Sequence, residues 1–219
     1  MNRLLGLLFC LFPLAQTTAQ TLNTKIYDGK EYVVSNVLIA GTPFFENAEN
    51  SENNTILFDK VLYSGVPLFY DIKADQLITR RPGELSSVIV VKEMVDLFTI
   101  GKDTIVRVKE ANTGLADGFY LRLYDSPEYK GVARYKKAVK DPKTANEKRY
   151  YTETVEYFVK TPAADRFVPL KNAEKLLSFD KKHKKNLKSL LRTYGINENS
   201  TAKIAFILDY LNKANTVSI

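Results

Sequence analysis

The sequence has very few of the residues on which many active sites and cross-links depend. Among 219 residues it has one cysteine, Cys10, one histidine, His183, two methionines and no tryptophan. A zinc site of the usual type needs three or four histidine and cysteine ligands, so the composition excludes one. Cys10 lies in the N-terminal segment. If that segment is cleaved off, the mature chain has no cysteine, which excludes disulfides and catalytic thiols. We expect no cofactor.

The first twenty residues predict a signal peptide. Arg3 is followed by an apolar run from Leu4 to Ala15, and the small residues 17–19 follow. A membrane anchor is the alternative, but this run is shorter than the roughly 20 residues that span a bilayer. We therefore expect cleavage near Gln20 and an exported chain that is periplasmic, outer-membrane-associated or extracellular. The mature chain is expected to contain no transmembrane span.

The remaining chain divides by its periodicity. Residues 21–54 have no regular pattern, and residues 55–170 contain short alternating runs separated by turn residues. Residues 171–219 change to the spacing of amphipathic helices. No strand–helix–strand rhythm appears, which argues against a parallel sheet. The sequence predicts an α+β fold that is mainly β: an antiparallel meander, either a curled sheet or a half-open barrel, followed by a C-terminal pair of helices packed on the sheet.

Several local expectations follow from turn chemistry. Ser64-Gly65 is predicted to be a turn between two strands, and the apolar run 86–100 reads as one long strand that is bent or central. Gly101 to Asp103 is predicted to be a three-residue hairpin loop. In the tail, Asn172 is a candidate cap for a short helix.

The two expected C-terminal helices each have one apolar stripe. The stripes consist of Leu187, Leu190, Leu191 and Tyr194, and of Ile204, Ile207, Leu208 and Leu211. Gly195 is a suitable terminator for the first helix, and Asn199 or Ser200 is a suitable cap for the second. Both stripes are expected to pack on the sheet.

One set of residues resembles a motif of secreted proteins from Bacteroidota. The pattern is a G-x-P-L-x-Y-D strand, an acidic residue in the next turn and a later F-x-I strand; the matching residues are Gly65, Pro67, Leu68, Tyr70, Asp71, Asp75, Phe98 and Ile100. The resemblance extends over roughly residues 61–179. The resemblance implies a protein of the Gram-negative cell envelope, and it implies no activity or catalytic residues.

The sequence contains no recognisable catalytic motif, and we do not expect an enzyme. Nucleophile-elbow, P-loop and zinc-protease patterns are missing. His183 is flanked by four lysines, which disfavour a role as general base. A hydrolase built from two carboxylates remains an alternative, although the sequence does not place any two acids together. The candidates by type are Asp59, Asp71, Glu93, Asp96, Glu153 and Glu156.

Charge is the most informative signal. Residues 21–127 hold 11 basic and 15 acidic side chains, a net charge of −4, whereas residues 128–192 hold 18 and 8, a net charge of +10. Such a block is typical of a surface that binds a polyanion, although a solvated face has the same composition. The candidate anion-binding residues are Lys181, Lys182, Lys184, Lys185 and Lys188.

These observations favour a non-catalytic binding or scaffold protein of the Gram-negative envelope that contacts anionic surfaces. For an exported chain the expected partners are anionic lipid, lipopolysaccharide or acidic glycan, and nucleic acid is not expected. A second hypothesis is a carrier that holds a lipid or apolar ligand in a curled sheet. A carboxylate-based hydrolase is the third.

Overall fold

The computed structural model describes residues 24–33, 38–45, 54–110, 113–142, 144, 148–178, 184–196 and 200–216. The predicted signal peptide, Lys181, Lys182 and His183 lie outside the described residues. Within the described ranges, no helix is both long and apolar enough to cross a membrane.

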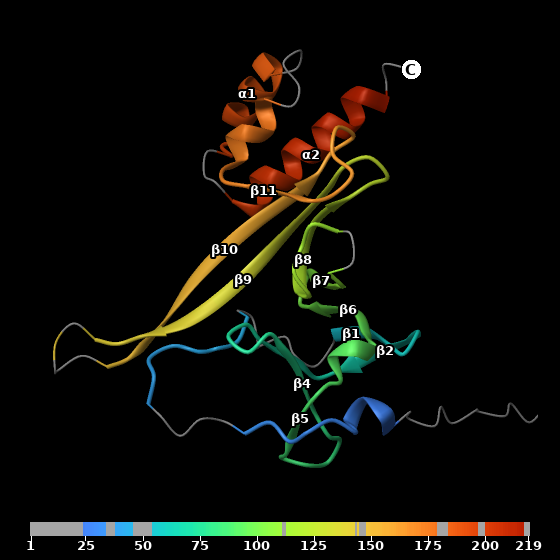
Figure 1. The fold of residues 1–219 in the computed structure, drawn as a ribbon, viewed down its shortest axis with the longest axis vertical. Helices are drawn as coiled ribbons and strands as arrows, with labels where there is room; N and C mark the ends of the chain where they lie inside the picture. The colour runs from blue at the N-terminus through green and yellow to red at the C-terminus, as the bar shows by residue number, and fades with distance from the viewer. Residues whose placement is uncertain are drawn as a thin grey trace, which may run out of the picture.

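Two antiparallel sheets and two C-terminal α-helices make up the fold (Figure 1). The larger sheet has eight strands in the order β11-β10-β9-β8-β7-β6-β1-β2, and the smaller has the order β3-β4-β5. The strands of the larger sheet are β1 (Asn54–Phe58), β2 (Val61–Val66), β6 (Val95–Ile100), β7 (Asp103–Val108), β8 (Gly118–Asp125), β9 (Lys130–Lys140), β10 (Tyr150–Lys160) and β11 (Val168–Leu170). Those of the smaller sheet are β3 (Leu68–Asp71), β4 (Gln76–Arg80) and β5 (Ser87–Ile89).

This arrangement confirms the predicted fold class, a mainly β antiparallel meander followed by two helices, and the larger sheet is not closed into a barrel. The chain leaves the larger sheet after β2, forms β3 to β5, and returns as β6 beside β1. The small sheet therefore lies at the end of the molecule opposite the helices, and the long β9–β10 hairpin runs between the two ends (Figure 1).

The first hairpin differs from its prediction. Asp59 and Lys60, both with positive φ (50° and 65°), form a two-residue turn that pairs Phe58 with Val61. The prediction of a turn at Ser64-Gly65 is wrong, because β2 continues through Gly65, which has a φ of 71°. Turns of this kind usually contain Asn or Gly, so an Asp-Lys pair gives little signal in the sequence.

The apolar run 86–100 is also divided, contrary to the single strand expected. β5 ends at Ile89, a 3₁₀ turn covers Lys92–Met94, and β6 begins at Val95. The break is where the chain passes from the small sheet to the large one, which apolar content alone does not reveal. The following loop has two residues, Gly101 and Lys102, because Ile100 pairs directly with Asp103. Gly101, at φ 58°, fits the first position of a tight hairpin turn.

The main core lies between the two sheets. The rings of Tyr70, Phe98 and Phe119 meet edge to face, with centroids 5.1–5.7 Å apart. Ile56 and Phe58 from β1 are fully buried beside them. Such edge-to-face contacts stabilise the packing beyond the area that they bury. Strand β3 is thereby fixed against β6 and β8.

A second core holds the C-terminal helices. It joins a 3₁₀ helix (Ala173–Ser178), α1 (Lys184–Thr193) and α2 (Thr201–Thr216) to β8, β10 and β11. Asn172 caps the first of these, because its Oδ1 accepts a hydrogen bond from Lys175 N at 3.1 Å. Ser200 Oγ accepts one from Lys203 N at 3.3 Å and caps α2. Gly195 (φ 66°) ends α1 with hydrogen bonds from Gly195 N to Arg192 O and from Ile196 N to Leu191 O, a Schellman motif.

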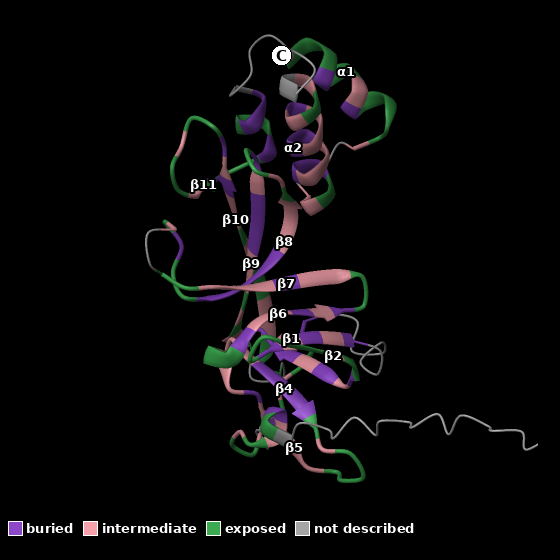
Figure 2. Cartoon of the chain, turned by 90° about the vertical axis from the view of Figure 1, so that its right-hand side faces the viewer, coloured by how far each residue is buried: buried purple, intermediate pink, exposed green. Residues whose placement is uncertain are grey.

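The apolar stripe of α2 is buried as predicted, and that of α1 is narrower than predicted. All four stripe residues of α2 are at most 1% exposed, and the inward faces of the helices are buried in Figure 2. On α1, Leu187 and Leu191 are buried, whereas Leu190 is only half-buried and Tyr194 is 65% exposed. Gly131 of β9 lets α2 approach closely, since a Cβ built there would lie 2.5 Å from Leu208 Cδ1.

Candidate functional site

The turn between β3 and β4 carries a carboxylate that joins the two sheets. Asp75 ends this turn at φ 53°, a conformation that aspartate tolerates better than most residues. Its Oδ1 accepts hydrogen bonds from Tyr70 OH at 2.7 Å and from Phe119 N at 3.3 Å. Asp71, at the start of the turn, accepts from Ala74 N at 2.9 Å and from Tyr32 OH at 3.0 Å. The two aspartates therefore fix both the shape of the turn and its position on β8.

Two cations approach the other oxygen of Asp75. The Lys92 ammonium lies 2.7 Å from Asp75 Oδ2, and the Arg134 guanidinium lies 3.4 Å from it. These three side chains are only 18–26% exposed. Lys92 also lies over the Phe119 ring, and Arg134 over the Tyr120 ring, each just over 5 Å from the centroid. Partial burial makes these interactions stronger than those of an exposed pair.

A second carboxylate, Asp117, completes the cluster. Arg107 donates two hydrogen bonds to it, at 2.7 and 3.1 Å, and Lys92 lies 3.7 Å away. The side chain of Arg107 is 6% exposed and also donates to Lys92 O. We call Asp75, Lys92, Arg107, Asp117 and Arg134 the charge cluster; it has three cations and two carboxylates.

The cluster changes the acidity of its members. Hydrogen bonds from Arg107 hold the pKa of Asp117 below its usual value. Burial, reinforced by the neighbouring Asp75 carboxylate, raises the pKa of Tyr70. Burial also raises the pKa of Tyr120, although Arg134 opposes the shift. Asp117 is thus held ionised beside neutral phenols, which suits a structural charge network and does not suit a general acid.

Gly118 leaves the space in which the cluster forms. A Cβ at this position would lie 2.8 Å from both Arg134 Nη2 and Asp75 Oδ2. The side chain of Arg134 can therefore pass the start of β8 and reach the turn of the small sheet.

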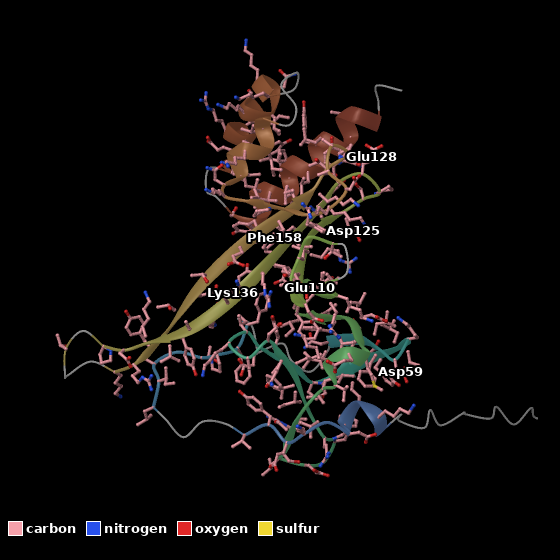
Figure 3. All side chains as sticks on the ribbon, viewed as in Figure 1. Asp59, Glu110, Asp125, Glu128, Lys136 and Phe158 are labelled. Atoms are coloured by element: carbon pink, nitrogen blue, oxygen red, sulfur yellow. The ribbon has the colours of Figure 1, made fainter. Side chains whose placement is uncertain are left out.

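Beside the charge cluster is an open groove of about 430 Å³. Four of its lining residues are cationic and one is acidic; these are Lys73, Arg134, Lys136, Lys137 and Asp75. The other lining residues are Ile72, Tyr135, Ala138, Thr152 and Thr154. The groove follows β9 where the hairpin extends beyond the rest of the sheet, around Lys136 in Figure 3. The sequence pointed to the basic block but not to this part of it.

Much of the basic charge on the β9–β10 hairpin is compensated across the strands. Lys136 contacts Glu156 at 2.7 Å, and Lys137 contacts Glu153, its cross-strand partner, at 3.5 Å. Lys137 also donates to Phe44 O and is 7% exposed, so its ammonium is not free for a ligand. Because these pairs form between distant residues, the net charge of the segment overstates the field at this surface.

The lysines of α1 have a different environment. Of the five predicted anion-binding residues, the structure describes Lys184, Lys185 and Lys188, and all three are exposed. No ion pair joins them to another described residue. They lie at the helical end of the molecule, well away from the groove around Lys136 (Figures 1 and 3). The basic block of residues 128–192 therefore forms two separate basic regions in the structure.

The candidate catalytic acids are dispersed and mostly paired. Asp59, Asp96, Glu153 and Glu156 each contact a lysine, and Asp71 holds its own turn. Among the described residues, no group of three or more histidine, cysteine, aspartate or glutamate side chains is placed to hold a metal ion.

Sequence reasoning missed the charge cluster because its members come together only in the fold. Lys92 lies 17 residues from Asp75 along the chain, and Arg134 lies 59 residues from it. The available signal was weak: an aspartate in a turn five residues after a buried tyrosine.

No known family model, curated protein or solved structure matches the chain.

Proposed function

We propose that this protein is an exported, non-catalytic binding or scaffold protein of the Gram-negative envelope that contacts anionic surfaces. The observation that carries the proposal is the exposure of Lys184, Lys185 and Lys188 on the surface of α1. The helix is anchored through Leu187 and Leu191 in the second core. A fixed helix that presents several lysines is suited to a negatively charged membrane or glycan layer.

The state of the carboxylates supports a role without catalysis. Glycoside hydrolysis needs one carboxyl group that keeps its proton and a second that faces it across the substrate. Asp75 and Asp117, which share Lys92, are instead both held by cations. Of the six acids considered from the sequence, four are bound by lysines.

The carrier hypothesis has less support. The described groove has one aromatic side chain, Tyr135, among mainly charged and hydroxyl-bearing residues. Tyr70, Phe98 and Phe119 are packed against one another in the core. A ligand-filled curled sheet would need such rings around an apolar cavity.

Vesicle binding tests the proposal. The parent protein should sediment with vesicles of phosphatidylcholine and phosphatidylglycerol at low salt, and not with phosphatidylcholine alone. Changing Lys184, Lys185 and Lys188 together to Gln should weaken binding by about 3 kcal/mol, roughly a hundredfold, because each lysine near an anionic membrane contributes about 1 kcal/mol. Added salt should reduce the difference by screening.

A matched control separates this surface from total charge. Lys30, Lys102 and Lys109 are exposed residues outside the basic block, and their joint replacement by Gln changes the net charge by the same amount. That control should bind vesicles as the parent does. Equal binding by the α1 variant and the parent would reject the proposal.

A further inference from the structure

The groove lies on one face of the β9–β10 hairpin, beside the part of β9 that has no partner strand on its other edge. The pairing of β8 with β9 ends at Leu121 and Ala133, whereas β9 continues to Lys140. The five consecutive residues 134–138 line the groove. Alternate side chains of a strand point to the same face, and the register of β9 with β10 places Arg134, Lys136 and Ala138 on the face of Thr152 and Thr154. Within the described part of the chain, no strand pairs with the other edge of β9 beyond Ala133.

Three cations from different parts of the chain are available in this groove. Lys73 comes from the β3–β4 turn, is exposed, and forms no ion pair with any described residue. Lys136 is about half-exposed despite its contact with Glu156. Arg134 is held only by longer contacts, at 3.2 Å to Tyr120 OH and at 3.3–3.4 Å to Asp117 O and Asp75 Oδ2. Its guanidinium can therefore gain a stronger partner.

Among the described residues that line the groove, Asp75 is the one acid, and it is already paired. Asp75 Oδ2 contacts Lys92 at 2.7 Å, and Lys92 does not line the groove. Glu156 and Glu153 compensate Lys136 and Lys137, so the excess of positive charge comes from Lys73 and from Arg134, which shares Asp75 with Lys92. The three accessible cations, Lys73, Arg134 and Lys136, suit a phosphate monoester better than a single carboxylate, because the phosphate carries nearly two charges at neutral pH.

The rest of the lining offers hydroxyl groups and one ring. Thr152 and Thr154 lie on the same side of β10, opposite Ala138 and Lys136. Thr152 Oγ1 donates only a long hydrogen bond, 3.3 Å, to Ala138 O. The volume of about 430 Å³ lies within the range of roughly 300–1,000 Å³ that is usual for small-molecule sites.

We propose that this groove binds a phosphorylated sugar. Lys73, Arg134 and Lys136 hold the phosphate, and Thr152 and Thr154 hydrogen-bond the sugar hydroxyls. The inference deepens the proposed function, on which it rests for the envelope setting, by naming the chemical class of one ligand. It places that ligand at a site separate from the lysines of α1.

Calorimetric titration tests the site with glucose 1-phosphate, inorganic phosphate and glucose. Glucose 1-phosphate should bind at least several-fold more tightly than inorganic phosphate, and glucose should not bind. Lys73→Gln and Lys136→Gln should each weaken binding of glucose 1-phosphate about tenfold, since each removes a charged contact to the phosphate. Thr154→Val should weaken binding of glucose 1-phosphate but leave the affinity for inorganic phosphate unchanged.

The vesicle-binding variant provides the control. Changing Lys184, Lys185 and Lys188 to Gln should leave the affinity for glucose 1-phosphate unchanged, so failure of the groove and failure of the α1 surface are distinguishable. If lipopolysaccharide competes with glucose 1-phosphate, the natural ligand is the sugar phosphate of an envelope glycolipid. If lipopolysaccharide does not compete, the natural ligand is a free sugar phosphate. Either result supports the site. Lack of binding, equal binding of glucose 1-phosphate and inorganic phosphate, or unchanged binding by both lysine variants would overturn the inference.

Discussion

At the scale of single residues, Asp75 shows how one side chain can determine the position of a whole turn. Its carboxylate has four protein donors, from Tyr70, Lys92, Phe119 and Arg134. These donors belong to β3, the 3₁₀ turn before β6, β8 and β9. Since partly buried charges must be paired, loss of the carboxylate would leave Lys92 and Arg134 uncompensated.

Replacing Asp75 by Asn should destabilise the protein by about 1–3 kcal/mol, because Asn tolerates the positive φ but removes the charge that the two cations need. Urea unfolding measures the change. Asp96→Asn is the matched control: Asp96 pairs with Lys60, which is 81% exposed, so its loss should cost less than about 1 kcal/mol. If both variants lose the same stability, the structural role assigned to Asp75 is wrong.

At the scale of elements, contact between α2 and β9 attaches the helical end to the sheet. Leu208 is fully buried, and Gly131 leaves room for its Cδ1. Either a smaller residue at 208 or a larger one at 131 would disturb this contact, for opposite reasons.

Leu208→Ala should cost about 2–5 kcal/mol through a cavity, and Gly131→Ala about 1–3 kcal/mol through overpacking. In the double variant the added methyl group meets the space left by the shortened side chain. The combined loss should therefore be smaller than the sum, by about 0.5–3 kcal/mol. Leu190→Ala, at a half-buried position of α1, should cost less than Leu208→Ala. Strictly additive losses in thermal or denaturant unfolding would argue against the contact.

At the scale of the whole molecule, two cores are connected through shared residues. Leu123 of β8 and Tyr157 of β10 pack against both the inter-sheet core and the helical core. The two ends are therefore joined by packed side chains as well as by the β9–β10 hairpin.

Several tyrosines make the stability of the molecule depend on pH in the alkaline range. Burial raises the pKa values of Tyr70, Tyr120 and Tyr157 above the ordinary value of 10.0. Below that value both the folded and unfolded states keep the phenol protons, so this contribution is fully present. Above it the unfolded state releases protons that the folded state retains, and the free energy of unfolding should fall as pH rises.

Tyr70→Phe should make this alkaline decline less steep, because the variant removes a phenol whose pKa is strongly raised. Urea unfolding at several pH values between about 8 and 11, around the ordinary tyrosine pKa, measures the slope. A variant with the same slope as the parent would show that Tyr70 does not contribute to it.

Sequence patterns were sufficient for features that depend on neighbours in the chain. Alternation along residues 66–72 and helical spacing from Ile204 to Leu211 predicted the strand and helix types, because burial of one face imposes the period. Capping by Asn172 and Ser200 and termination at Gly195 are also local. These features together predicted the fold class.

Only the tertiary structure decided which distant charges meet. The sequence showed a basic block, but pairing of β9 with β10 placed Lys136 beside Glu156, whereas the lysines of α1 are exposed. Packing of the small sheet on the large one brought Lys73 and Arg134 to one groove beside Asp75. The physical reason is that periodicity reports which side of an element is buried, whereas a charge cluster depends on how strands are ordered and registered across the whole sheet.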